Sequence, residues 1–124
     1  MFKSNEKETP INKIETLIGE GCSIIGSLKG DDLLKIDGYI EGNITWQNDI
    51  IFGSTGYCKG NIYCKTAYVN GKIDGNITCE ETLCIESYGK ITGDINVKNI
   101  IIKDGGIFQG NCSIRNADDF NSLE

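Results

Sequence analysis

Residues 71–77 read GKIDGNI: a glycine, an apolar residue two positions on, a second glycine, an Asn or Asp, and another apolar residue. Full copies of this motif start at Gly38, Gly56, Gly71, Gly89 and Gly106, and a looser copy, IIGSL, covers residues 24–28. The second glycines stand at positions 26, 42, 60, 75, 93 and 110, so the repeat is 15 to 18 residues long. Repeats built from helix pairs need roughly 30 residues or more, whereas this length fits one turn of a β-solenoid with short strands and tight corners.

Apolar residues alternate with polar residues around each motif. We counted positions at even offsets from the second glycine and allowed a slip of two residues before the motif. All 25 positions in the five full copies are apolar, in a chain that is 39% hydrophobic. The residues between them, such as Glu41, Lys59 and Asp74, are mostly polar. Because every second side chain of a strand faces the same side, we predict an all-β, single-domain parallel β-helix of about six short turns, stacked about 4.8 Å apart.

Stacking of the turns is expected to place like residues above one another. One internal column is predicted to contain Ile44, Ile62, Ile77, Ile95 and Cys112. The residues after the second glycines form a corner column of Asn43, Asn61, Asn76, Asp94 and Asn111. We expect glycine, Asn and Asp to supply the positive φ angles that corners need and that β-branched residues resist. An ion-binding row is the alternative, but the column lacks the repeated aspartates of calcium-binding β-rolls.

Length and charge limit how the chain is organised. Its 124 residues allow one domain. We expect the β-helix to span residues 15–115, with disordered tails at 1–14 and 116–124, the second of them acidic. The net charge of −6 argues against a nucleic-acid partner. No apolar run approaches the ~20 residues of a membrane span, and the charged N-terminus lacks the apolar stretch of a signal peptide, so we expect a cytoplasmic protein.

The sequence offers few residues for catalysis. Histidine, the commonest general base and metal ligand, is absent, and the six cysteines contain no CxxC pair. We therefore predict no enzyme activity, no catalytic residue, no cofactor and no metal site, and we expect free, buried thiols. The chain also lacks the G-x4-G-K-[ST] pattern of nucleotide-binding loops, so assembly is expected to need no ATP or GTP.

Both ends of the predicted solenoid lack an evident cap. An open end exposes unpaired backbone groups and one unshielded layer of the core, and end-to-end stacking would bury both. The predicted interface at the C-terminal end consists of Ile100, Ile102, Phe108, Cys112 and Ile114, and Phe108 is its candidate anchor. The predicted interface at the N-terminal end consists of Ile18, Ile24 and Leu28. The alternative for Phe108 is that it fills the core of a monomer.

Two further surfaces are candidates for binding. Met1, Phe2 and Lys3 place two large apolar side chains beside a charge, a combination that can insert into a bilayer surface. Weak single anchors would gain avidity from many copies in a filament. The second surface is an outward-facing column of Ile51, Tyr68, Cys84 and Ile101. It predicts lateral pairing or a protein partner, unless a tail packs over it.

The sequence resembles the bactofilin family over roughly residues 15–115. The resemblance rests on TLIG at residues 16–19, IDGYIEG at 36–42 and GIFQG at 106–110, together with the repeated motif. It implies a right-handed β-helix and a bacterial cytoskeletal protein that forms non-polar filaments without nucleotide. It also implies a scaffold on the inner face of the cell membrane, with a short N-terminal anchor, that positions cell-wall or cell-shape proteins.

Other solenoid proteins are weaker matches. Hexapeptide-repeat acyltransferases and solenoid carbonic anhydrases depend on histidine, which this chain lacks. The β-helical domain of the division inhibitor MinC accompanies a second globular domain, for which this chain has no room. A non-polymerising β-solenoid adaptor in the cytoplasm remains the alternative to a filament protein.

Overall fold

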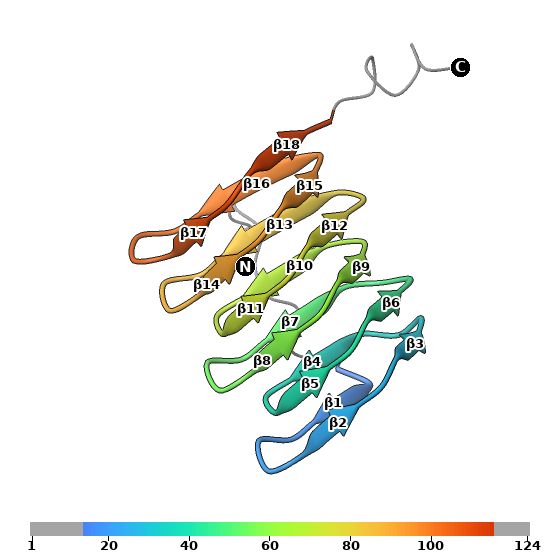
Figure 1. Ribbon diagram of the computed structural model, residues 1–124. Coiled ribbons are helices and arrows are strands. Elements are labelled where there is room, and N and C mark those ends of the chain that lie inside the picture. Colours follow the sequence, from blue (N-terminus) through green and yellow to red (C-terminus); the bar gives the residue numbers. More distant parts are fainter. Residues whose placement is uncertain (1–13, 116–124) are drawn as a thin grey trace, which may run out of the picture.

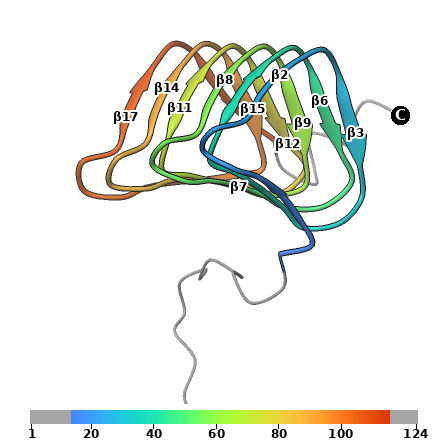
Figure 2. The ribbon, with the colours of Figure 1, turned by 90° about the horizontal axis from the view of Figure 1, so that it is seen from below.

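The computed structural model describes residues 14–115 as a stack of short strands (Figure 1). The predictions for the two tails, apart from residue 14, lie outside the described residues. Three strands make up each turn, and corresponding strands of successive turns pair in parallel to form three six-stranded sheets. Seen from below the stack, the three sheets enclose one narrow core (Figure 2). The prediction of an all-β parallel solenoid of about six turns is confirmed.

Each sheet contains one strand from every turn. Sheet A consists of β1 (Thr16–Ile18), β4 (Leu34–Ile36), β7 (Ile50–Phe52), β10 (Ala67–Val69), β13 (Thr82–Ile85) and β16 (Asn99–Ile102). Sheet B consists of β2 (Ser23–Ile25), β5 (Tyr39–Glu41), β8 (Tyr57–Lys59), β11 (Lys72–Asp74), β14 (Lys90–Thr92) and β17 (Ile107–Gln109). Sheet C consists of β3 (Leu28–Gly30), β6 (Ile44–Trp46), β9 (Ile62–Cys64), β12 (Ile77–Cys79), β15 (Ile95–Val97) and β18 (Cys112–Ile114).

The core follows the alternation in the sequence. The four inner strands of sheet B bury only their middle residue, so the column of Ile40, Cys58, Ile73 and Ile91 is fully enclosed. The four inner strands of sheet C bury their first and last residues, and Ile44, Ile62, Ile77 and Ile95 stack in the predicted internal column. Because like apolar residues lie directly above one another, each turn closes the core of the turn below it.

Glycine alone supplies the positive φ angles at the corners. Gly60 has a φ of +151°, and a Cβ at this position would collide with the carbonyl oxygen of Gly42 in the turn below. Among residues 14–115, no residue other than glycine has a positive φ. The expectation that Asn and Asp adopt this conformation was therefore wrong. The glycine in front of each of them already makes the corner, which leaves the Asn or Asp in an ordinary backbone conformation.

Candidate assembly and docking surfaces

The last turn leaves part of the core exposed. Ile102 and Ile114 are 49% and 51% exposed, whereas Ile85 and Val97, which occupy the same positions one turn earlier, are fully buried. Strands β16, β17 and β18 are the outermost strands of their sheets. Ile100 and Phe108 are partly buried against the core, and Cys112 is exposed. In the part of the chain that the structure describes, no element covers this layer.

The first turn presents a second open end. Strands β1, β2 and β3 are the opposite outermost strands of the three sheets. Ile18 is buried, while Ile24 and Leu28 are partly buried against the core. All three predicted residues therefore lie in one layer at this end. Sequence reasoning did not include Leu17 and Ile25, which are 60% and 78% exposed, because their parity assigned them to the outer face.

The outer column of sheet A lies in register but is not open to solvent. Ile51, Tyr68, Cys84 and Ile101 occupy successive paired positions in β7, β10, β13 and β16. Ile51, Tyr68 and Cys84 are only 5%, 3% and 1% exposed, whereas Ile101 is 37% exposed. Ile51, Tyr68 and Cys84 form a hydrophobic cluster separate from the solenoid core, together with Leu33 and the partly buried Ile14. We call Ile51, Tyr68 and Cys84 the sheet A stripe.

Charged residues border the sheet A stripe. Lys35 Nζ lies 3.1 Å from Asp37 Oδ2, and Lys103 Nζ lies 3.3 Å from Glu86 Oε1. A groove of about 360 Å³ is lined by Lys35, Asp37 and Glu86 and by the apolar side chains of Ile51 and Tyr68. Burial, together with nearby carboxylates including Asp49 and Glu86, raises the pKa of Tyr68 to about 12. The stripe is therefore a water-poor strip bordered by Lys–carboxylate ion pairs.

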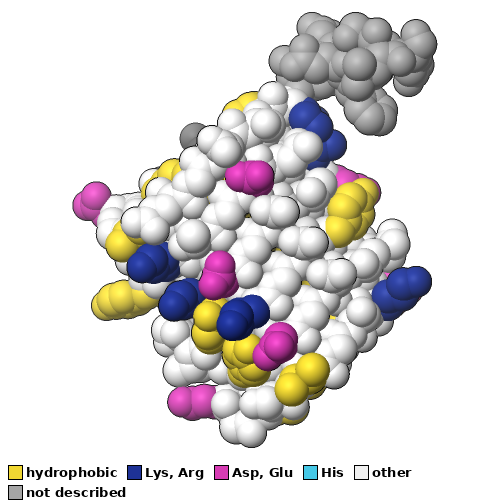
Figure 3. Space-filling model, in the orientation of Figure 1, with side chains coloured by type: hydrophobic (Ala, Val, Ile, Leu, Met, Phe, Trp, Pro, Cys, Tyr) yellow, Lys and Arg dark blue, Asp and Glu magenta, His cyan; other side chains and the backbone are white. Residues whose placement is uncertain are grey.

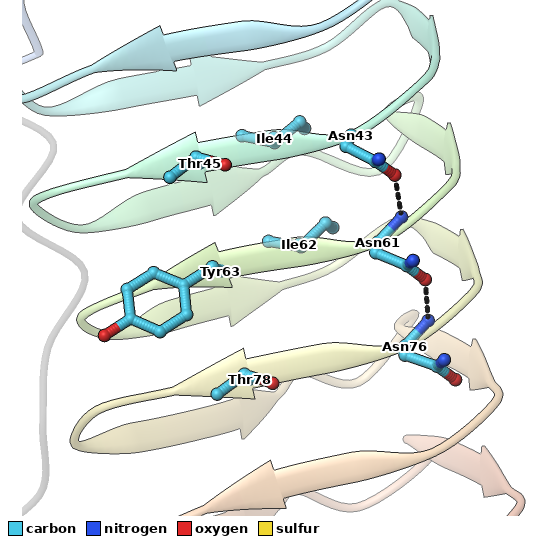
Figure 4. Close-up of a pocket in the computed structure, with 8 residues that line it drawn as sticks. All are labelled: Asn43, Ile44, Thr45, Asn61, Ile62, Tyr63, Asn76 and Thr78. Atoms are coloured by element: carbon cyan, nitrogen blue, oxygen red, sulfur yellow. Dashed lines mark hydrogen bonds between the residues drawn. The ribbon is translucent and has the colours of Figure 1, made fainter.

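The corner column on sheet C makes a ladder of hydrogen bonds. The backbone N–H of Asn61 donates to Asn43 Oδ1 at 3.1 Å, and the N–H of Asn76 donates to Asn61 Oδ1 at 3.3 Å (Figure 4). Asp94 continues the ladder by donating its N–H to Asn76 Oδ1 at 3.0 Å. A groove of about 320 Å³ lies beside these residues. Because the side chains bond to the backbone of the next turn, the column has a structural role, which favours the interpretation as corner chemistry over the ion-binding row.

None of the six cysteines, all of which lie among residues 14–115, forms a disulfide bond. Cys58, Cys64, Cys79 and Cys84 are buried, and Cys22 and Cys112 are exposed. The sulfur atoms of Cys64 and Cys79 lie 3.8 Å apart, well beyond the length of a disulfide bond. Burial raises the pKa of Cys58 to about 12, so this thiol stays protonated and is a poor nucleophile. The hydrogen bond with Cys79, together with burial, raises the pKa of Cys64 well above its ordinary value.

The structure describes neither a metal site nor a membrane span. Among residues 14–115, no three His, Cys, Asp or Glu side chains gather closely enough to bind a metal ion. The same residues include no helix of the length and hydrophobicity that crossing a bilayer requires. The predicted anchor residues Met1, Phe2 and Lys3 lie outside the described residues.

Comparisons with known proteins agree on one family. Residues 16–113 match the sequence profile of bactofilins, described as polymer-forming cytoskeletal proteins. The chain is 31% identical over 110 residues to bactofilin BacP of Myxococcus xanthus, covering 89% of this chain and 46% of that protein. The chain therefore spans about half the length of this curated relative.

Two solved structures share the solenoid. The structure of the cytoskeletal bactofilin BacA, determined by solid-state NMR, matches with a TM-score of 0.75 and 26% identity, over 84% of this chain and 99% of that one. A bactofilin of Thermus thermophilus, reconstructed by cryo-EM as double helical filaments, matches with a TM-score of 0.71 and 19% identity, over 79% and 99% of the two chains. From its fold and from the profile that spans all but the edges of the solenoid, this chain belongs to the bactofilin family of polymer-forming cytoskeletal proteins.

Proposed function

We propose that this protein assembles end to end into filaments through the two open turns of its solenoid. The observation that carries the proposal is the exposure of Ile102 and Ile114, whose equivalents one turn earlier are fully buried. A second solenoid stacked on this layer would bury these side chains, and complete burial of one such side chain contributes about 1.5–3 kcal/mol. It would also pair the outer backbone edges of β16, β17 and β18. The cytoskeletal filaments of its family support the same role.

The role is structural rather than catalytic, and the filament is a scaffold. We propose that assembly proceeds without nucleotide and produces non-polar filaments that lie on the inner face of the cell membrane. Met1, Phe2 and Lys3 are the proposed membrane anchor, and cell-wall or cell-shape proteins are the proposed cargo. The support for these finer features is the resemblance to bactofilins and the apolar side chains of Met1 and Phe2.

A non-polymerising adaptor is the alternative function, and one substitution separates the two. Phe108→Arg places a charge in the proposed junction, and Tyr88→Arg is the control because Tyr88 is an aromatic residue that is 79% exposed on the side of the solenoid. Negative-stain microscopy and sedimentation without nucleotide should show filaments for the unmodified chain and the control. Phe108→Arg should give a folded protein limited to monomers or short oligomers. Long filaments from Phe108→Arg would contradict the proposed junction, and an unmodified chain that stays monomeric would favour the adaptor.

A further inference from the structure

The sheet A stripe is buried although its side chains point away from the core. On sheet C, the middle residue of each strand also points outward, and none of these residues is buried. Tyr63 and Tyr68 make the comparison direct, because both are the middle residue of a strand. Tyr63 in β9 is 38% exposed and Tyr68 in β10 is 3% exposed. Both tyrosines occupy the same position in a solenoid strand, so the strand geometry does not explain why Tyr68 is buried and Tyr63 is exposed.

The face formed by sheets B and C shows what an uncovered surface of this protein looks like. In Figure 3, that face mixes hydrophobic side chains with charged and polar ones. On sheet A, apolar character continues over three successive strands. The burial also has limits along the column, because Leu17 in β1 is 60% exposed and Ile101 in β16 is 37% exposed. The burial therefore extends over β7, β10 and β13 and stops before both ends.

The chain enters the solenoid at the edge of this stripe. The N–H groups of Glu15 and Thr16 both donate to the carbonyl oxygen of Leu33, at 3.0 and 3.1 Å. Leu33 belongs to the same hydrophobic cluster as the stripe, and Ile14 packs against that cluster. Ile14, the first residue that the structure describes, therefore contacts the same hydrophobic cluster as the stripe.

From these observations we infer that the sheet A stripe is the docking surface for residues 1–13 of the same chain. Thirteen residues can extend to about 43 Å, whereas β4 and β13 are three strand spacings apart, or about 14 Å. The segment carries Met1, Phe2 and Ile11 as apolar side chains that match the apolar stripe, while its Lys3, Lys7 and Lys13 are largely balanced by Glu6 and Glu8. A tethered segment has a high effective concentration at its own solenoid, which favours it over a second copy as the occupant.

Alkylation of Cys84 tests the inference, since this thiol is 1% exposed in the middle of the stripe. The exposed thiols are first removed with Cys22→Ser and Cys112→Ser, and Cys58 reports on the integrity of the core. Phe2→Asp with Ile11→Asp removes apolar contacts from the segment. Asn5→Asp with Asn12→Asp adds the same charge and leaves those contacts intact. With N-ethylmaleimide, we expect Cys84 to react about tenfold faster in the apolar-to-Asp chain than in the control, corresponding to about 1.4 kcal/mol of lost docking. Equal rates would overturn the inference.

Repeating the measurement with Phe108→Arg separates docking from filament assembly. Docking within one chain predicts that Cys84 stays protected in this variant and that its reaction rate does not depend on protein concentration. Protection that disappears on dilution or in Phe108→Arg would assign the cover to a second copy and overturn the inference, whatever the fate of the proposed filament.

A second measurement covers the case in which the apolar-to-Asp chain misfolds and Cys58 becomes reactive. A nitroxide attached at Asn5→Cys, in the chain without Cys22 and Cys112, should broaden backbone amide resonances of β7 and β10. Those of β9 and β12 on sheet C are the internal control and should be broadened less, because they lie on a different face of the solenoid. Broadening on sheet C alone, or on neither sheet, would overturn the inference.

Discussion

The indole of Trp46 occupies the space that Gly30 leaves in the first turn. The two residues pair across β3 and β6, and a Cβ at Gly30 would collide with the indole ring. The Trp46 Nε1–H donates to the carbonyl oxygen of Asp32, which satisfies the polar group of the ring, and the side chain is only 4% exposed. Later turns place a smaller side chain at this position, such as Cys64, Cys79 or Val97. Trp46 therefore fills the N-terminal end of the core for two turns at once.

This arrangement predicts a strong coupling between Gly30 and Trp46. Trp46→Ala should lower the free energy of unfolding by about 3–5 kcal/mol because it leaves a cavity. Gly30→Ala alone should lower it by about 1–3 kcal/mol through overpacking, and should be nearly neutral in the Trp46→Ala background, where the space is empty. Urea unfolding of the four chains measures the cycle. Gly21→Ala is the control, since a Cβ there meets nothing within 4 Å. Additive effects would show that the two residues are not coupled.

The repeat could be predicted because the same residue types recur at equivalent positions in successive turns. Each corner between sheets B and C has a glycine, as at Gly60, where the backbone of the preceding turn leaves no room for a Cβ. Each inward position needs an apolar residue, as at Ile73 and Ile91. Both requirements act within one turn or between equivalent positions of neighbouring turns. Spacing and alternation in the sequence therefore reveal them.

The features that sequence reasoning missed depend on contacts outside the repeat. Gly30 and Trp46 fit together because one is small and the other large. Since the two residues are dissimilar, no periodic pattern in the sequence indicates this contact. Leu33 lies in a corner, outside the counted positions, yet it joins the hydrophobic cluster on sheet A. The burial of Tyr68 also escapes a parity argument, because parity says which side a residue faces and not what covers that side.

The buried thiol of Cys58 and the buried hydroxyl of Tyr68 predict that the folded protein loses stability at alkaline pH. The pKa of Cys58 rises from an ordinary value of 9.0 to about 12, and that of Tyr68 from 10.0 to about 12, chiefly through burial. Above pH 9 the unfolded chain releases the Cys58 proton while the folded chain retains it. The contribution of Cys58 to stability is therefore full below pH 9 and that of Tyr68 is full below pH 10. Each contribution falls as the pH rises toward 12, by up to about 1.4 kcal/mol per pH unit. Urea unfolding from pH 7 to 11 measures the decline.

Cys58→Ala should make the decline of the free energy of unfolding with pH less steep, even if the substitution lowers stability at pH 7. Cys22→Ala is the matched control, since the Cys22 thiol is exposed. A decline between pH 9 and 11 that is equally steep in both variants would show that Cys58 does not contribute to it.

The proposed membrane anchor and the proposed docking segment share Phe2, and this gives a testable competition. Phe2→Asp should abolish co-sedimentation with anionic lipid vesicles, because an acidic group replaces the inserting ring. Asn5→Asp is the control with the same added charge and should still bind. Vesicles should also speed the alkylation of Cys84 in the unmodified chain, since lipid would draw the segment away from the sheet A stripe. Binding by Phe2→Asp at the level of the control would place the anchor elsewhere.

The two ends of the solenoid carry opposite charges, which bears on how the subunits are oriented. Among residues 14–115, the first turn carries Glu15, Glu20, Asp31 and Asp32 with one base, Lys29, and the last turn carries Lys98, Lys103 and Arg115 with one acid, Asp104. The proposed non-polar filament joins like ends and so brings like charges together. Screening by salt should therefore strengthen its assembly, whereas a head-to-tail filament joins opposite charges and should weaken with salt. Sedimentation between 50 and 500 mM NaCl measures the direction.

Mixing two end variants decides the orientation directly. Phe108→Arg blocks the C-terminal end, and Leu28→Arg blocks the N-terminal end, where Leu28 packs against the core. In a non-polar filament each variant keeps one self-complementary junction, so each alone should form dimers, and a mixture should contain only these homodimers. In a head-to-tail filament neither variant can pair with itself, and only the mixture would form a dimer. Analytical ultracentrifugation, after circular dichroism has established that both variants are folded, distinguishes the two patterns. Heterodimers from two monomeric variants would rule out the non-polar arrangement.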